Sequence, residues 1–268
     1  MSDTPLFSGN IAANYDKYLG PYLFEPYAND LAERLKNDEC KMVLELACGT
    51  GRVTKYLLET LSSDGKLVAT DINNDMLAVA KSIVDDDRIE WQAVDAQDLP
   101  FRDNTFDHVL CQYGVMFFPD KLKAFREAYR VLGKGGKYIF NVWGSLEDNP
   151  RAGLVRKVLD DVFKEDAPDF LQRGPYSFYK PDLIKEMLQN AGFVSVTVEA
   201  VKKEVEYAHA DDAANGYLTG TPINSFFQKK DEAVRKRLFQ QIREASQQEF
   251  GDSLKAQMLA YVCTGEKN

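Results

Sequence analysis

The sequence predicts an α/β protein with a doubly wound, mostly parallel sheet. Three observations lead to this fold class: short apolar runs recur along the first 145 residues, helical periodicity separates them, and a glycine-rich turn directly follows the first run. Unbroken apolar runs are typical of strands that helices cover on both faces. Strands that alternate with helices pair in parallel, because a parallel connection must cross back over the sheet.

The first five strands are expected where apolar residues concentrate, at 42–47, 67–71, 89–94, 106–111 and 138–143. Polar side chains at 73–75 can cap the helix after the second strand, since Asn and Asp accept hydrogen bonds from the first helical amides. Pro119 is expected in the first turn of the helix after the fourth strand. The glycines at 133–136 are expected to end that helix.

The second half of the chain is predicted to complete the sheet and to cover it. A helix over 183–191 ends at Gly192, and 193–201 resembles a sixth strand. A helical insertion around 211–250 precedes a last strand at 258–263. Because no linker separates the halves, we interpret residues 1–268 as one domain.

Composition excludes several classes of function. The chain has 33 Lys and Arg against 42 Asp and Glu, which gives a net charge of −9. Nucleic acids and anionic lipids are bound by clustered Lys and Arg, so neither is an expected partner. Two histidines in the chain argue against a multi-His metal site. We expect a small-molecule substrate, with no nucleic acid, no metal and no stable membrane insertion.

The cysteines and the N-terminal residues predict a cytoplasmic protein. The four cysteines lie far apart in the sequence, and none forms a C-x-x-C pair. Asp3 interrupts the first residues before any apolar core, which argues against a signal peptide. The longest apolar runs, such as 115–118, are too short to cross a bilayer.

The segment ELACGTG at 45–51 carries the strongest chemical signal. It ends the first predicted strand, and Asp71 ends the second strand 20 residues after Gly51. A glycine turn lets a ligand approach the backbone at the carboxyl end of a sheet, and a carboxylate at that spacing accepts hydrogen bonds from ribose hydroxyls. These features predict a ligand that contains adenosine.

The turn does not have the G-x-G-x-x-G spacing of a dinucleotide site. Glu45 in front of it would repel a pyrophosphate but would attract a ligand with an ammonium and a sulfonium. Asp95 ends the third predicted strand, where it can accept a hydrogen bond from an adenine amine beside the Ala96 amide.

Several ordered motifs now point to one family. The segments VLELACGTG, VATDIN, VDAQDLPF and FDHVLCQYGVMFFPD, with the glycine-rich turn before YIFNVW, resemble a class I S-adenosylmethionine-dependent methyltransferase. The similarity is greatest to the small-molecule group related to ubiquinone and menaquinone C-methyltransferases, over about residues 40–145. It implies a Rossmann-like seven-stranded sheet with the order 3-2-1-4-5-7-6 and an antiparallel last strand.

The resemblance also divides the domain by role. It implies N-terminal cover helices over 1–38, a cofactor-binding core over 40–145, substrate-side insertions with late helices over 146–255, and a final strand over 256–265. The implied cofactor is S-adenosyl-L-methionine, with S-adenosyl-L-homocysteine as product. Ala47 stands where the family has its first glycine, and its methyl group is expected to narrow the turn without preventing binding.

The residues that the resemblance assigns to the cofactor lie after successive strands. They are Glu45, Ala47, Cys48, Gly49, Thr50, Gly51, Asp71, Ile72, Met76, Asp95, Ala96, Gln112 and Tyr113. In the family pattern the first six hold the methionine moiety, Asp71 holds the ribose, the next four lie at the adenine, and the last two lie beside the sulfonium and the amino acid tail.

Methyl transfer from a sulfonium is an in-line displacement, so the protein mainly aligns the reactants and excludes water. The sequence indicates no clear general base; the candidates are His209, Asp16 and Tyr113. Candidates for the acceptor wall, most of them aromatic, predict a small, partly apolar, aromatic or quinone-like acceptor. These candidates are Tyr15, Tyr18, Met116, Phe117, Trp143, Tyr176 and Tyr217.

Other interpretations stay open at this point. Several of the aromatic residues can simply fill the core. The chain can also be a regulatory protein that binds the cofactor without turnover, or a nicotinamide-dependent oxidoreductase, which the glycine spacing argues against.

Overall fold

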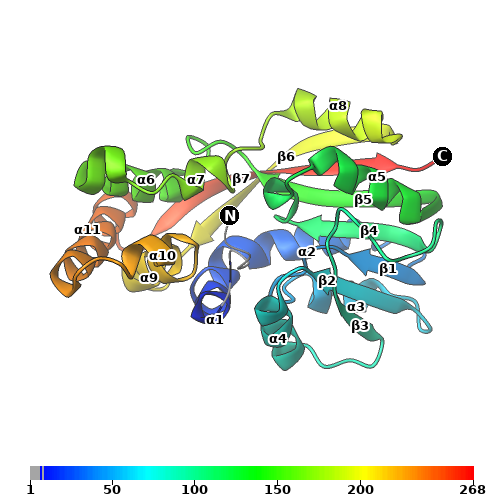
Figure 1. Cartoon of the computed structure of the whole chain (residues 1–268), viewed down its shortest axis with the longest axis horizontal. Helices are drawn as coiled ribbons and strands as arrows, with labels where there is room; N and C mark the ends of the chain where they lie inside the picture. The colour runs from blue at the N-terminus through cyan, green and yellow to red at the C-terminus, as the bar shows by residue number, and fades with distance from the viewer. Residues whose placement is uncertain (1–6, 8) are drawn as a thin grey trace.

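A seven-stranded mixed sheet forms the centre of the computed structural model, which describes residues 7 and 9–268 (Figure 1). Its strands are β1 (Met42–Glu45), β2 (Lys66–Asp71), β3 (Ile89–Ala93), β4 (Phe106–Gln112), β5 (Leu132–Trp143), β6 (Val194–Glu206) and β7 (Lys255–Glu266). The strand order is β3-β2-β1-β4-β5-β7-β6, with β7 antiparallel to both of its neighbours. The predicted fold class and strand order are therefore confirmed.

Helices cover both faces of the sheet, and several of them gather beyond the carboxyl ends of its central strands. They are α1 (Asn10–Tyr18), α2 (Glu25–Glu33), α3 (Thr54–Thr60), α4 (Asn74–Ile83), α5 (Lys121–Val131), α6 (Pro150–Phe163), α7 (Phe170–Arg173), α8 (Pro181–Ala191), α9 (Ala210–Thr219), α10 (Ile223–Phe227) and α11 (Glu232–Phe250). A π-helical turn, η1 (Gly20–Phe24), joins α1 to α2, and short 3-10 turns lie at η2 (Val115–Phe117) and η3 (Lys164–Asp166). Figure 1 shows α1, α6, α7, α9 and α10 beyond the carboxyl ends of β4 and β5, where a parallel sheet binds its ligands.

Local sequence signals explain how several helices begin and end. The side chain of Asn73 caps α4 by accepting a hydrogen bond from the Asp75 amide at 2.9 Å. Gly192 ends α8 with a left-handed φ of 110°, a conformation that glycine adopts without a Cβ clash. Both predictions are confirmed.

The prediction for α5 was wrong at both ends. Pro119 precedes the helix, and Asp120 caps it by accepting from the Lys123 amide at 2.9 Å. The glycines at 133–136 belong to β5, which begins at Leu132. The ladder with β4 shifts its register there, and a Cβ on Gly136 would lie 2.6 Å from the Asp107 carbonyl oxygen. Glycine thus allows an irregular strand where the sequence suggested a turn.

Strands β6 and β7 are longer than the sequence predicts. They form one antiparallel ladder from Val194 paired with Glu266 to Glu206 paired with Lys255. β6 is an edge strand; Lys202 and Glu204 face solvent, whereas Lys203 is partly buried beside Asp30 and Val205 is buried. The end of this strand was not predicted, because polar residues on its open face interrupt the apolar run by which the strand was recognised.

No helix in the described part of the chain is long and apolar enough to cross a membrane. All four cysteines are buried and unpaired, and residues 7 and 9–268 contain no group of three or more side chains suited to hold a metal. Residues 1–6 and 8, which include Asp3 and the start of the predicted N-terminal cover, lie outside the described residues.

Candidate functional site

The turn after β1 is built from left-handed backbone. Ala47, Gly49 and Gly51 have φ angles of 50°, 57° and 82°. Glycine adopts such angles freely, whereas an alanine adopts them at an energetic cost. Ala47 therefore does not simply narrow the turn: it holds a conformation that favours glycine. Its methyl carbon lies 2.5 Å from the position that a Cβ on Gly114 would take, so Gly114 leaves the room that Ala47 needs.

Asp71 joins this turn to the end of β2. Its side chain is buried, and its two oxygens accept hydrogen bonds from the Gly49 amide at 2.9 Å and the Asn73 amide at 2.8 Å. Burial raises the pKa of this carboxyl, and the two amides oppose that rise. The backbone thus fixes the orientation of the carboxylate, while each oxygen keeps room for a further donor.

Glu45 is a buried acid at the end of β1. It is 1% exposed, and Oε2 accepts a hydrogen bond from the Thr54 hydroxyl at 2.6 Å. Burial raises the pKa of Glu45 to about 8; the Thr54 hydrogen bond lowers it in part, and the charge of Asp71 raises it further. At neutral pH the Glu45 carboxyl is therefore mostly protonated until a cation approaches it.

Polar atoms and open space complete this edge of the sheet. Thr50 Oγ1 and Asn73 Nδ2 are buried without a hydrogen-bond partner among the described residues. A Cβ on Gly49 would meet no atom within 4 Å. Unpaired buried polar atoms beside open backbone are what a bound polar ligand would satisfy.

The predicted adenine side is only partly assembled. Asp95 Oδ1 accepts from the Gln97 amide at 2.8 Å, and the Gln97 side chain also donates to Asp95. Met76 is buried, whereas Ile72 is 63% exposed, which is unusual for a large apolar side chain. Asp95 stabilises its own turn, and Ile72 offers an apolar surface beside Asp71.

An aromatic cluster lies at the ends of β4 and β5. Tyr113 has a left-handed φ of 53°, and its amide donates to Asn141 Oδ1 at 3.0 Å. Its ring stacks on Trp143, with centroids 4.0 Å apart and planes 13° apart. Burial and then the nearby tyrosines raise the pKa of Tyr113 well above its usual range, and its hydroxyl has no partner among the described residues. Gln112 donates to the Phe24 carbonyl oxygen at 3.0 Å.

Comparisons with known proteins match this arrangement of turn, acids and sheet. Residues 44–140 match the family model described as a methyltransferase domain. The demethylmenaquinone methyltransferase of Lactiplantibacillus plantarum is 31% identical over 184 residues, which cover 62% of this chain and 76% of that protein. This chain belongs to the S-adenosylmethionine-dependent methyltransferases.

A further relative is named as a methyltransferase, and two solved structures share the fold. The demethylmenaquinone methyltransferase of Staphylococcus carnosus is 29% identical over 218 residues, which cover 75% of this chain and 88% of that protein. A putative methyltransferase from Bacillus halodurans shares the fold at a TM-score of 0.59 and 22% identity, covering 90% of this chain and 98% of its own. The Haemonchus contortus phosphoethanolamine N-methyltransferase 2, solved with S-adenosyl-L-methionine, has a TM-score of 0.61 at 18% identity, covering 96% of this chain and 56% of its own. The predicted family, enzyme class and cofactor are confirmed.

The methyltransferase brings most of the predicted acceptor-wall residues into one cluster. Trp143 lies 6.3 Å from Tyr176 between ring centroids, and its amide lies 3.5 Å from the Met116 sulfur. Tyr15 stacks on Phe24 at 4.6 Å, next to Tyr113. Tyr217 is buried with an unpaired hydroxyl. Phe117 stacks on Phe170, and Tyr18 contacts Lys17.

Sequence reasoning missed two aromatic residues of this cluster. Phe24 contacts both Tyr113 and Trp143, and Tyr27 meets the same two rings edge-on. They come from η1 and α2, far from the motif in sequence, and no motif marks them. Only their apolar periodicity in the N-terminal helices could have identified them as buried.

The three candidate general bases lie in different surroundings. Asp16 forms an ion pair with Arg52, with the closest atoms 2.8 Å apart. His209 is an exposed N-cap residue of α9. Burial holds the pKa of Tyr113 far above neutral pH, so its hydroxyl stays protonated.

Arg52 directly follows the glycine turn and links this turn to the N-terminal helices of the methyltransferase by hydrogen bonds. Its guanidinium donates to Asp16 Oδ1 at 3.0 Å, to the Asp16 carbonyl oxygen at 2.9 Å and to Glu25 at 3.0 Å. Lys55 and Tyr56 also hydrogen-bond Glu25. A Cβ on Gly20 would lie 2.5 Å from the guanidinium, so this glycine leaves room for it. The glycine turn after β1 and the helices α1 and α2 are thus joined through Arg52.

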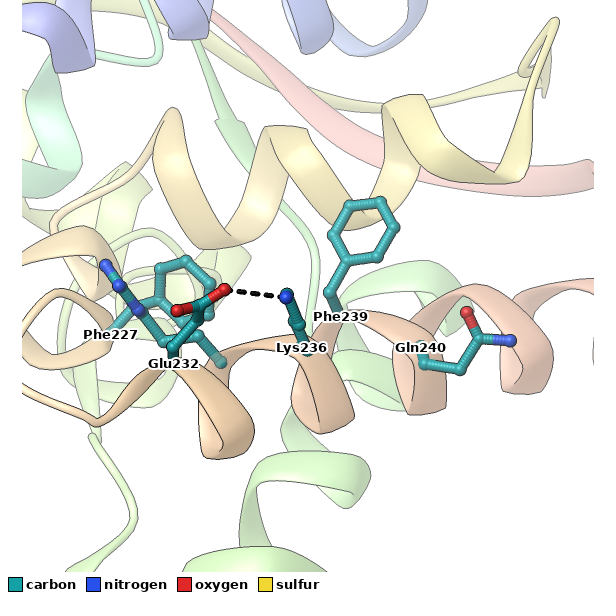
Figure 2. A pocket seen from close by; sticks show the side chains of 6 residues that line it. Phe227, Glu232, Lys236, Phe239 and Gln240 are labelled. Atoms are coloured by element: carbon teal, nitrogen blue, oxygen red, sulfur yellow. Dashed lines mark ion pairs between the residues drawn. The ribbon is translucent and has the colours of Figure 1, made fainter.

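Two surface hollows lie apart from this site. Figure 2 shows the first, a groove of about 440 Å³ at α10 and α11 whose wall carries the Lys236–Glu232 ion pair at 2.6 Å. The second, of about 410 Å³, lies between 145–148 and 179–183. None of the predicted site residues lines either hollow.

Proposed function

We propose that this methyltransferase transfers a methyl group to a small, partly apolar acceptor that is aromatic or quinone-like. The stacked Tyr113–Trp143 pair carries the proposal, because it lies at the carboxyl ends of two adjacent strands, as Glu45 and Asp71 do. Flat aromatic rings favour a flat acceptor by offset or edge-to-face packing. Relatives named demethylmenaquinone methyltransferases support a quinone-like acceptor.

We propose that the cofactor lies along the ends of β1, β2, β3 and β4. Asp71 would accept from the ribose hydroxyls, and Glu45 with the 47–51 backbone would hold the methionine moiety. The unpaired Thr50 hydroxyl and the open space at Gly49 support this placement. Ile72 and Met76 would contact the adenine, with Asp95 and Ala96 at its edge and with Gln112 and Tyr113 beside the amino acid tail. Cys48, buried in the turn, would contribute through its backbone.

The bound cofactor supplies a methyl group on a positive sulfonium, which is already activated for displacement. The residues of the chain then need only to align the acceptor and to exclude water. Trp143, Met116 and Tyr176 would form the wall against which the acceptor lies, with Tyr15, Tyr18, Phe117 and Tyr217 further out. A buried aromatic cluster without a paired base is consistent with an acceptor that loses its proton readily on its own.

We also propose that the enzyme acts on free small molecules in the cytoplasm, without nucleic acid. The net charge of −9 supports this, because a surface that binds the phosphate backbone of a nucleic acid is rich in Lys and Arg. In this proposal residues 1–38 cover the cofactor, 40–145 bind it, 146–255 select the acceptor, and 256–265 complete the sheet of a single domain.

Turnover with labelled S-adenosyl-L-methionine tests the proposed acceptor class. The purified protein is incubated with matched panels of quinols, phenols and aliphatic amines, after calorimetry has established that S-adenosyl-L-homocysteine binds. We expect label in the quinols or phenols and none in the aliphatic amines. Transfer to the amines alone would reject the acceptor class, and tight binding without any turnover would instead indicate a regulatory protein.

A further inference from the structure

Arg151 in the first turn of α6 is a buried cation without an acidic partner. It is 2% exposed, and its only hydrogen bond among the described residues runs from Nη2 to the Val205 carbonyl oxygen at 3.0 Å. Its Nε and Nη1 atoms are buried with no partner. A guanidinium remains charged in proteins, so these N–H groups are left without an acceptor where water cannot reach them.

Aromatic rings compensate this charge only in part. The guanidinium carbon lies 4.5 Å from the centroid of the Tyr207 ring and 4.9 Å from that of Phe250. Such cation–π contacts attract the charge but accept no hydrogen bond in the plane of the guanidinium. Burial accordingly lowers the pKa of Arg151 from its usual value.

Two tyrosine hydroxyls near Arg151 also lack partners. Tyr207 and Tyr217 are 1% and 3% exposed, and neither hydroxyl meets hydrogen-bond geometry with a described residue, although the Tyr176 hydroxyl lies close enough to that of Tyr217 to act on its pKa. The charge of Arg151 acts on both hydroxyls, lowering pKa values that burial raises. Asp212, whose charge acts on Tyr207, already accepts a hydrogen bond from Tyr22 at 2.9 Å. The group thus has a guanidinium and two hydroxyls but no carboxylate of its own among the described residues.

This group continues the aromatic cluster at the proposed acceptor wall. Tyr176 lies 6.3 Å from Trp143 between ring centroids. Burial raises the pKa of the Tyr176 hydroxyl, and the neighbouring hydroxyls of Tyr217 and Tyr207 raise it further. Tyr176 is thus a neighbour both of the Tyr113–Trp143 stack and of the tyrosines whose hydroxyls the charge of Arg151 reaches.

We propose that Arg151, with the hydroxyls of Tyr207 and Tyr217, binds a carboxylate on the acceptor. The proposal rests on the acceptor lying against Tyr113 and Trp143, as proposed above. A carboxylate offers two acceptor oxygens and one negative charge, which match one guanidinium and two hydroxyls. A phosphate monoester carries more charge than this single cation can balance. The acceptor is thus a flat, aromatic carboxylate whose methylated end lies away from Arg151.

Binding of small aromatic carboxylates to the cofactor-loaded protein tests this inference. With S-adenosyl-L-homocysteine saturating, calorimetry compares 4-hydroxybenzoate and 3-(4-hydroxyphenyl)propionate with the corresponding amides, and inorganic phosphate with chloride. We expect the wild type to bind the carboxylates at least tenfold more tightly than the amides. Arg151→Met should lose that preference and keep its affinity for S-adenosyl-L-homocysteine.

Two further variants separate ligand binding from folding. Lys157→Met removes one positive charge from the exposed face of the same helix and should keep the wild-type preference. Tyr217→Phe removes one hydroxyl at nearly constant volume and should weaken carboxylate binding several-fold without affecting the amides. It therefore tests the site even if Arg151→Met does not fold.

The possible failures are distinguishable. If the wild type binds no S-adenosyl-L-homocysteine, both the cofactor site and the carboxylate site are wrong. If it binds that molecule but binds carboxylates and amides equally, or if Arg151→Met keeps the preference, only the carboxylate proposal is overturned. Binding of inorganic phosphate in place of the carboxylates would overturn it in favour of a phosphorylated acceptor.

Discussion

At the scale of single residues, Asp71 is the carboxylate whose orientation the backbone fixes most completely. Its oxygens accept from the amides of Gly49 and Asn73, and each keeps a lone pair for the ribose hydroxyls that we propose it binds. We expect Asp71→Ala to weaken binding of S-adenosyl-L-homocysteine by about 1–3 kcal/mol, the value of hydrogen bonds to a charged group. Calorimetry on the purified variant measures this loss.

A modified ligand isolates the contact of Asp71 with the ribose from its effect on the turn. The 2′-deoxy analogue of S-adenosyl-L-homocysteine should bind the wild type more weakly than the parent, whereas Asp71→Ala should bind both equally. If the variant still distinguishes the two ligands, Asp71 does not bind the ribose.

We expect the Glu45 carboxyl to release a proton when the cofactor binds. Burial raises the pKa of Glu45 to about 8, so its carboxyl is mostly protonated at pH 7 in the ligand-free protein. An ammonium placed beside it favours the ionised form and drives the proton into solution. Calorimetry in buffers of different ionisation enthalpy should show release of close to one proton per S-adenosyl-L-homocysteine bound at pH 7. Glu45→Gln should show no such release, and equal release from both proteins would place the ammonium elsewhere.

At the scale of elements, α1 and α2 depend on Arg52 for their attachment to the glycine turn after β1. Its hydrogen bonds to Asp16 and Glu25 are partly buried, and bonds of this kind contribute about 1–3 kcal/mol. We expect Arg52→Ala to speed amide hydrogen exchange across α1 by roughly one to two orders of magnitude. Arg126→Ala, which removes an exposed arginine from α5, is the matched control. Unchanged exchange in α1 would mean that its apolar contacts alone hold it.

The contrast between predicted and unpredicted elements has a physical cause. The glycine turn and Asp71 could be predicted because left-handed backbone and a carboxylate at a strand end are local properties of the sequence. Arg52 and Arg151 could not, because their partners lie far away in the chain and a helix-forming arginine usually faces solvent. Helix and strand ends were least predictable where glycines continue a strand, as at 133–136.

At the scale of the whole molecule, the buried acids at the ends of β1 and β2 each add a contribution to stability that falls as the pH rises. The folded protein keeps a proton on Glu45 up to about pH 8, whereas the unfolded chain releases it near the ordinary value of 4.5. The contribution of Glu45 to stability is therefore complete below pH 4.5 and is lost as the pH rises to about 8. The raised pKa of Asp71 acts in the same direction.

Thermal unfolding from pH 5 to 9 measures this contribution as the difference between the wild type and Glu45→Gln. The neutral amide imitates the protonated carboxyl, so we expect the variant to gain stability relative to the wild type as the pH rises, by on the order of a few kcal/mol. Saturating S-adenosyl-L-homocysteine should reduce the difference in slope, because its ammonium stabilises the ionised carboxylate of the wild type. Parallel profiles for the two ligand-free proteins would show that water reaches Glu45 and that its pKa is ordinary. Glu45 would then be ionised already at pH 7, and cofactor binding would release no proton from it.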